Sequence, residues 1–276
     1  MQGLAPGAPK ESNQAMIEAP CPAPLSLRHP WSWSVVVAGL VAAAALWGSE
    51  ANLALFLTIN HAFSGTFWAG LTIFGDTVVA LALLLPLCWR RPDIVRAVAI
   101  SAIFAALLTH GIKVLAAMPR PAAVLEAELI RITGPLLTRS SFPSGHTTTI
   151  FTLTGVICLL NPAARWRYGL LIFATLVGLS RAGVGAHWPV DIAAGMALGW
   201  LCALLGVHLG RHWRGGLSLT ARRIYALLFG GCAIALLAGY NTHYGVAEPL
   251  QYLVAIATLV LTAPDLRYLF GGDKST

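Results

Sequence analysis

The chain has 276 residues, of which 57% are hydrophobic and only 11% are charged, and its mean hydropathy is +0.72. Since about a quarter of the residues of an ordinary soluble domain are charged, this composition excludes that class and indicates an integral membrane protein. The formal net charge of +7 does not indicate a nucleic-acid partner, because the basic residues are not gathered on one soluble face.

Residues 1–33 contain six prolines and no apolar face, so we expect a disordered cytoplasmic tail. Eight apolar stretches follow, at 34–49, 68–89, 96–117, 146–160, 168–182, 189–208, 223–240 and 250–264. A hydrocarbon core of about 30 Å takes roughly 20 apolar residues per helix. The stretches therefore predict an all-α, polytopic transmembrane helical bundle, in which the first, fifth and eighth helices are short.

The basic residues alternate between the two predicted sides of the membrane. If residues 1–33 are cytoplasmic, the cytoplasmic segments carry 13 of the 18 Lys and Arg residues. By the positive-inside rule, this excess predicts that both termini are cytoplasmic. The five outer exceptions are Lys113, Arg120, Arg131, Arg139 and Arg181.

Three polar clusters fall on the outer side, each at the end of a predicted helix. They contain Lys113 and Arg120 in "KVLAAMPRP", Ser144, Gly145 and His146 in "SFPSGHTTT", and Ser180, Arg181, His187 and Asp191 in "SRAGVGAHWPVD". The alternation of the helices brings all three clusters to one membrane face.

The cations of these clusters predict a phosphate site. Lys113, Arg120 and Arg181, called here the cationic cluster, match a multiply charged oxyanion, and arginine binds phosphate through two parallel hydrogen bonds. A helix that begins at Ser144 and Gly145 adds unpaired backbone N–H groups and the positive end of a helix dipole.

The two histidines supply reactive groups. The carboxylate of Asp191, four residues after His187, can orient the imidazole and stabilise its cation, which makes His187 the candidate nucleophile. His146 is the candidate general acid. No metal ion or other cofactor is expected, because the outer loops lack a carboxylate cluster and the five cysteines lack CxxC spacing.

Each cluster also has a purely structural interpretation. Ser144 can act only as a helix N-cap, and Asp191 can act only as a dipole partner in a first helical turn. Lys113 and Arg120 can extend from a membrane boundary into water. One phosphate site accounts for all of these residues together, and we therefore favour it.

The three clusters resemble the signature motifs of the type 2 phosphatidic acid phosphatase (PAP2) superfamily. The resemblance covers residues 35–208 and implies a six-helix core over 34–208, with the active site at its outer end. It implies a phosphohistidine on His187 and an acid role for His146. It also implies phosphate contacts from Lys113, Arg120, Ser144, Gly145 and Arg181, with Ser180 as a further candidate. Residues 209–276, which we expect to form two additional transmembrane helices and a short cytoplasmic tail, lie outside this pattern.

We therefore expect an integral membrane enzyme of the bacterial cytoplasmic membrane that removes a terminal phosphate from a lipid phosphate or diphosphate at the outer face. Undecaprenyl diphosphate, phosphatidylglycerol phosphate, phosphatidic acid and lipid A all fit as substrates. Two alternatives stay open: a transporter that binds the lipid phosphate without cleaving it, and a phosphotransferase that passes the phosphate to another lipid. The sequence leaves the oligomeric state open.

Other polar residues near the outer face have weaker signals. Asp76 is expected to pair with a cation of the cationic cluster, and Asn60 is expected in the first outer loop. His110 is expected to serve in helix packing, and an indirect role at the site is the less favoured interpretation. Arg131 and Arg139 are expected to be solvated.

Overall fold

Every regular element in the described part of the computed structural model, residues 26–161 and 164–270, is helical. The helices of four or more residues are α2 (Trp31–Leu46), α3 (Glu50–Ala62), α4 (Gly65–Thr72), α5 (Thr77–Ala82), α6 (Leu87–Arg90), α7 (Pro92–Ala116), α8 (Gly145–Leu160), α9 (Ala164–Gly183), α10 (Pro189–His212), η4 (Arg214–Leu217), α11 (Leu219–Leu237), α12 (Glu248–Thr262) and α13 (Leu266–Phe270). The all-α class is confirmed. Most of the predicted N-terminal tail, residues 1–25, and the end of the predicted C-terminal tail, residues 271–276, lie outside the described residues.

Fewer single helices are long enough to cross a membrane than the eight apolar stretches predict. Within the described ranges, four helices satisfy length and composition, at Pro92–Ala123, Pro189–His212, Leu219–Leu237 and Gly245–Asp265. The count rises to five if the bent pair α2 and α3 forms one span. Helix α8 is apolar but shorter.

The second predicted span, 68–89, is not one continuous helix. A short 3-10 turn, η1 (Ile73–Gly75), follows α4, and Asp76 then starts α5 by accepting hydrogen bonds from the backbone N–H groups of Val78 and Val79 at 2.8 and 3.3 Å. Further on, Pro86 precedes α6 and Pro92 begins α7. Proline interrupts a helix because it has no backbone N–H to donate, and the Asp76 cap interrupts it because the carboxylate accepts the N–H groups that a preceding helical turn would otherwise bind.

The first predicted outer loop contains a helix that we did not expect. Helices α2 and α3 meet at an angle of 107°, and Gly48 between them has a φ of +64°. This left-handed conformation favours glycine and permits the sharp change of direction. Asn60 therefore lies on α3 and not in a loop.

Helix α10 is the central helix of the bundle and packs against α8, α2 and α7. Its glycines allow this close packing, because a Cβ atom on Gly206 would collide with Ser101 of α7 and one on Gly199 would collide with the backbone of Thr148 in α8. Small residues at such crossings let membrane helices pack backbone to backbone. Trp200 of α10 is fully buried and donates a hydrogen bond to the carbonyl of Ser32 at 2.8 Å.

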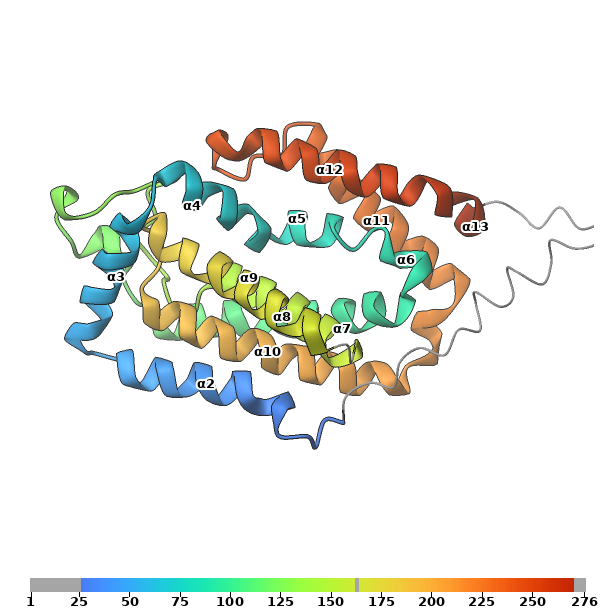
Figure 1. Cartoon of the computed structure of the whole chain (residues 1–276), viewed down its shortest axis with the longest axis horizontal. Coiled ribbons are helices and arrows are strands. Elements are labelled where there is room, and N and C mark those ends of the chain that lie inside the picture. Colours follow the sequence, from blue (N-terminus) through green and yellow to red (C-terminus); the bar gives the residue numbers. More distant parts are fainter. Residues whose placement is uncertain (1–25, 162–163, 271–276) are drawn as a thin grey trace, which may run out of the picture.

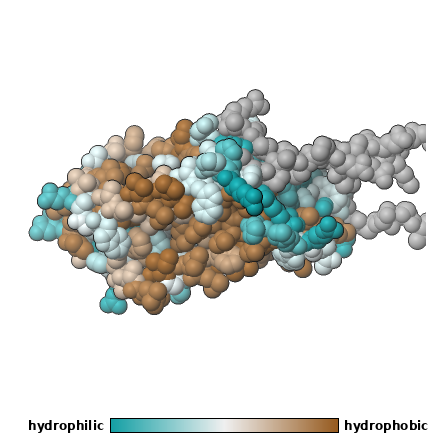
Figure 2. Space-filling view, turned by 90° about the horizontal axis from the view of Figure 1, so that it is seen from below, coloured by the Kyte–Doolittle hydropathy of each residue, from teal (hydrophilic) through white to brown (hydrophobic). Residues whose placement is uncertain are grey.

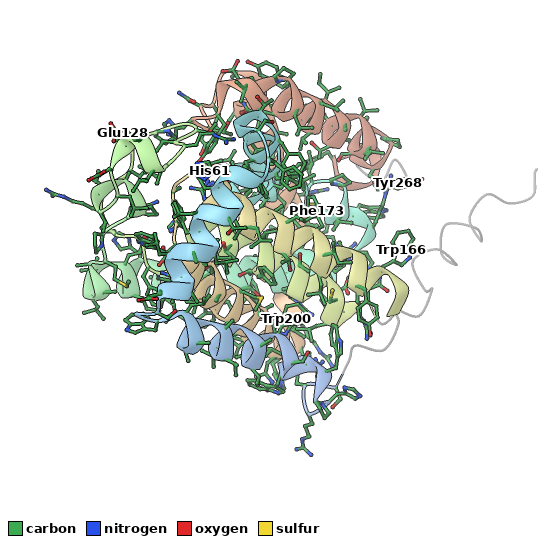
Figure 3. All side chains as sticks on the ribbon, turned by 60° about the vertical axis from the view of Figure 1, so that its left-hand side comes forward. His61, Glu128, Trp166, Phe173, Trp200 and Tyr268 are labelled. Carbon is green, nitrogen blue, oxygen red and sulfur yellow. The ribbon has the colours of Figure 1, made fainter. Side chains whose placement is uncertain are left out.

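The two ends of the bundle differ. The long loop 118–142, the end of α9 and the start of α10 lie together at the left of Figure 1, whereas α2 begins and α13 ends toward the right. Figure 3 shows the same separation, with His61 and Glu128 at one end and Trp166 and Tyr268 at the other. Between the ends, one face is broadly hydrophobic (Figure 2), as expected of a surface in contact with lipid.

Candidate active site

The pair His187 and Asp191 lies buried where α10 begins. Nδ1 of His187 is 3.2 Å from Oδ2 of Asp191, and these side chains are 3% and 0% exposed. The same carboxylate oxygen accepts hydrogen bonds from the backbone N–H of Trp188 at 2.9 Å and from the hydroxyl of Ser141. Because Pro189 occupies the first helical turn and Asp191 caps it, the local sequence fixes the carboxylate against the imidazole.

The other ring nitrogen of His187 faces Arg120. Nη1 of Arg120 is 3.2 Å from Nε2 of His187, and since a guanidinium only donates, Nε2 carries the lone pair and Nδ1 carries the proton. Burial holds the pKa of His187 well below its ordinary value of 6.5, and the positive charges of Arg120, Arg181 and Lys113 lower it further. The imidazole is therefore neutral at neutral pH, with its lone pair on Nε2.

Arg120 joins the first cluster to the third. Its Nε donates to the carbonyl of Arg139 at 2.8 Å, and its Nη1 also donates to the carbonyl of Ala186 at 2.9 Å. Lys113 donates to the carbonyls of Ser140 and Ser141 at 2.7 and 3.2 Å. The loop 118–142 thus supplies neutral carbonyl acceptors for both cations, and an oxyanion would be a stronger acceptor.

Two hydroxyl groups from other parts of the chain accept hydrogen bonds from Arg181. Its Nη1 donates to the hydroxyls of Thr72 at 2.6 Å and Tyr244 at 2.7 Å. Its Nε is buried and has no hydrogen-bond partner among the described residues. A buried N–H without a partner is costly, so an acceptor bound at this position would be favoured.

The start of α8 brings the second cluster to the third. The backbone N–H of Ser144 donates to the carbonyl of Asp191 at 3.0 Å, and its hydroxyl accepts from the backbone N–H and the hydroxyl of Thr147 at 3.4 and 2.9 Å. Ser144 is therefore a helix N-cap, as its structural interpretation requires. Gly145 and His146 form the first turn that follows, where backbone N–H groups have no partner within the helix.

A cavity of about 320 Å³ opens beside this turn, between α5, α7 and α8. Its lining includes Lys113, His110, Gly145, His146 and several threonine side chains. The remainder is apolar and includes Ala80, Leu84, Val98, Ala102, Ala105 and Leu153. Along α7 the lining runs from Val98 to Lys113, which is about 22 Å at 1.5 Å per residue. A charged site and an apolar cavity therefore share one wall.

Asp76, Ser180 and His110 were also singled out in the sequence, and the structure shows what each of them contacts. Asp76 does not meet the cationic cluster in the described part of the chain; it caps α5 and accepts a hydrogen bond from the hydroxyl of Tyr240 at 3.3 Å. The expected pairing is wrong because the start of α5 uses this carboxylate. The hydroxyl of Ser180 donates to the carbonyl of Val177 at 2.6 Å, within its own helix. His110 is exposed and lines the cavity.

Asn60 has a structural role, because its side chain joins three segments by hydrogen bonds. Its side chain is fully buried and donates to the carbonyls of Arg131, Ala182 and Gly183 at 2.8, 3.2 and 3.1 Å, while it accepts from the backbone N–H of Arg131 at 2.8 Å. It thereby ties α3 to the long loop and to the end of α9. Arg131 is not simply solvated, because its Nη1 donates to the carbonyl of Phe63 at 2.7 Å.

The sequence reasoning missed three residues of the site: Ser141, Thr72 and Tyr244. Ser141 is the first residue of the quoted stretch "SFPSGHTTT", and its place three residues before Ser144 was an available signal. Thr72 and Tyr244 lie far from every cluster, and only the fold brings their hydroxyls to Arg181. Within 26–161 and 164–270, no three His, Cys, Asp or Glu side chains form a group that could hold a metal ion.

Comparison with known proteins identifies the family. Residues 94–214, which contain all three clusters, match the model of the PAP2 superfamily. The predicted resemblance to this superfamily is confirmed over these residues, which are a little less than half of the chain. The match begins in α7 and ends just after α10, so it leaves α11 and α12 outside.

Several known proteins are similar in sequence to parts of the chain. An undecaprenyl-diphosphatase from Sulfolobus acidocaldarius is 41% identical over 76 residues, which are 27% of this chain and 36% of that protein. A lipid A 1-phosphatase from Rhizobium johnstonii is 40% identical over 72 residues, 26% of this chain and 29% of that protein. The chain thus spans about a third of the length of these two relatives. Undecaprenyl-diphosphatase BcrC from Bacillus subtilis is 27% identical over 157 residues, 55% of this chain and 78% of that protein.

A solved structure supports the fold. The crystal structure of Aquifex aeolicus LpxE superimposes with a TM-score of 0.53 and 28% sequence identity. The similarity covers 58% of this chain and 96% of that chain. The chain therefore has a helical, LpxE-like fold with several long apolar helices, and the remainder of its length lies outside the shared part.

Proposed function

We propose that the protein is a membrane phosphatase that removes a terminal phosphate from a lipid phosphate or diphosphate. The observation that carries this proposal is the neutral, buried His187, whose Nε2 lies 3.2 Å from Arg120 and whose Nδ1 lies 3.2 Å from Asp191. A nucleophile with a fixed tautomer beside a phosphate-binding cation is suited to phosphoryl transfer.

The proposed reaction has two steps. In the first, Nε2 of His187 attacks phosphorus, the bond from phosphorus to the leaving oxygen breaks, and His146 gives a proton to that oxygen. In the second, water attacks the phosphohistidine, the P–N bond breaks, His146 takes a proton from the water and phosphate is released. Asp191 stabilises the positive imidazole in the intermediate.

The cationic cluster stabilises the negative charge of the transferred group. Lys113, Arg120 and Arg181 contribute charge, and the first turn of α8, which begins at Gly145 and is capped by Ser144, contributes backbone N–H groups. Ser180 contributes only indirectly, because its hydroxyl is directed to Val177. The chain supplies all of these groups, and the proposed chemistry needs no metal ion or other cofactor.

The apolar cavity beside His146 supports a lipid substrate, because hydrocarbon would be buried there while the phosphate meets the cationic cluster. Two of the relatives are named for undecaprenyl diphosphate and lipid A, so these two lipids are the first to test. Phosphatidylglycerol phosphate and phosphatidic acid complete the panel.

We further propose that the site faces the outside of the cytoplasmic membrane. The excess of Lys and Arg on the opposite side supports this orientation. Residues 34–208 would then form the catalytic core and residues 209–276 an additional helical part.

The test is a release assay with the purified protein, the four lipids and excess EDTA. We expect free phosphate from at least one lipid and no requirement for Mg²⁺. Lipid binding without phosphate release would favour a transporter. Transfer of label to an added lipid faster than to water would favour a phosphotransferase, and a rate that EDTA abolishes and Mg²⁺ restores would contradict the mechanism.

A further inference from the structure

We infer that the connection between α11 and α12 completes the active site, and that Tyr244 in this connection is a positioning residue for Arg181. The inference rests on the proposed function. Tyr244 lies outside residues 94–214, which match the PAP2 model, so this contact comes from the additional C-terminal part of the chain.

The contact is direct and buried. Nη1 of Arg181 donates to the hydroxyl of Tyr244 at 2.7 Å, and Cζ of Arg181 lies 5.8 Å from the centre of the tyrosine ring. The two residues are 2% and 4% exposed. Thr72, at the end of α4, accepts from the same Nη1 at 2.6 Å. Two hydroxyls from different parts of the chain therefore hold one nitrogen of the guanidinium.

This anchoring leaves another donor of Arg181 free. Its Nε is buried and without a hydrogen-bond partner in the described part of the chain. Since a buried donor of this kind gains from any acceptor that reaches it, an anchored guanidinium is prepared for a phosphate oxygen. The hydroxyl of Tyr244 thus orients the group and leaves its charge available.

The connection itself is firmly held. The side chain of Gln251 on α12 donates to the carbonyls of Leu236 and Tyr240 at 2.9 Å each. The ring of Tyr244 packs on Gly134 of the long outer loop, where a Cβ atom would lie 2.6 Å from Cε1 of the tyrosine. Gly134 also has a φ of +89°, a conformation that favours glycine. The position of Tyr244 is therefore set by packing and by hydrogen bonds.

Helices α11 and α12, which follow the residues that match the PAP2 model, reach the site from the side of α4 and α5. Helix α11 packs against α5 and α12, and the short turn before α12 packs against α4. In Figure 1, α11 and α12 form the upper layer of the molecule, next to α4 and α5. The site therefore depends on a layer that the three motifs do not include.

The test compares Tyr244→Phe, which removes only the hydroxyl, with Tyr252→Phe, which makes the same change at an exposed position on α12. Loss of a hydrogen bond to a charged group predicts a decrease of about 10- to 100-fold in kcat/KM for Tyr244→Phe. We expect orthovanadate, which mimics the transferred phosphate, to inhibit this variant more weakly by a similar factor. Tyr252→Phe should match the wild type in both measurements.

A double-mutant cycle separates positioning from a general structural effect. In an Arg181→Gln background, Tyr244→Phe should cause little further loss, because its effect passes through Arg181. Thr72→Val, which removes the second acceptor, should reproduce the loss and serves as the test if Tyr244→Phe lowers the thermal midpoint.

The outcomes distinguish this inference from the proposed function. A wild-type protein that releases no phosphate from the lipid panel would refute the proposed function. An active wild type whose Tyr244→Phe variant keeps its kcat/KM and vanadate inhibition would overturn only the role of Tyr244. The role of Tyr244 would also be overturned if Tyr244→Phe lowered kcat/KM in the Arg181→Gln background by the same factor as in the wild type.

Discussion

Nε2 of His187 lies 3.2 Å from Nη1 of Arg120, on the side of the ring opposite to Asp191. The imidazole is thus held between a permanent cation and a carboxylate. Because the cation can only donate, the lone pair of Nε2 is directed at the N–H of Arg120, and this N–H would have to turn to the phosphate before Nε2 could attack. The same arginine would position the substrate and fix the tautomer of the nucleophile.

His187→Ala should abolish phosphate release, with a decrease of at least about 10³-fold in kcat, because no other group of the proposed mechanism replaces the attacking nitrogen. Lipid binding should persist, since the cationic cluster is intact. Release from radiolabelled lipid and retention of lipid on the purified variant measure the two effects. His208→Ala, an exposed change on α10, is the control, and substantial release by His187→Ala would remove this residue from the mechanism.

Asp191→Asn should lower kcat by about 10²- to 10⁴-fold with a smaller effect on stability. The amide can still accept from the backbone N–H of Trp188 and keep the cap of α10, but its NH₂ group can present a donor to Nδ1 and favour the wrong tautomer. Turnover and the thermal midpoint, measured on the same preparation, test this separation. Equal kcat values for the variant and the wild type would show that the carboxylate serves only as a cap.

Parts of the three clusters could be predicted because the residues that interact there are only a few positions apart in the sequence. The spacing of His187 and Asp191 by four residues, with Pro189 between them, already places a carboxylate in the first turn of a helix next to an imidazole. The start of α8 at Ser144 is a local signal of the same kind. The contacts of Arg120 and Lys113 with loop carbonyls depend on how residues 118–142 fold, and the sequence pattern does not specify that path.

Features that arise from long-range packing were not predictable. The apolar pattern of 68–89 continues through η1, and only the cap by Asp76 and its contact with Tyr240 reveal the break. Tyr244 has no motif around it, since its role comes from the way α11 and α12 bring their connection to Arg181. The helix α3 was missed because Glu50–Ala62 falls between the apolar stretches 34–49 and 68–89.

The free energy of unfolding should decrease as the pH falls below about 6.5. His187 contributes to this decrease because its pKa in the folded protein is well below the ordinary value. In this range the unfolded chain binds a proton that the folded chain does not, so acid favours unfolding by up to about 1.4 kcal/mol per pH unit for this residue. Above pH 6.5 both states are neutral and the contribution disappears. His187→Gln should therefore lose less stability than the wild type between pH 7 and pH 5.5, as measured by thermal midpoints in detergent. Identical decreases in the two proteins would show that other groups cause the acid sensitivity.

The orientation of the site in the membrane can be tested with single cysteines. We expect the loop 118–142 to be outside, because the predicted topology puts 13 of the 18 Lys and Arg residues on the opposite side and the positive-inside rule places that side in the cytoplasm. In a background without the native cysteines, Ala127→Cys in this loop and Gly215→Cys at the other end are both exposed positions. An impermeant thiol reagent added to intact cells should label Ala127→Cys and leave Gly215→Cys unlabelled until the cells are permeabilised. The reverse pattern would place His187 and the cationic cluster on the cytoplasmic face, and the substrate would then have to come from the inner leaflet.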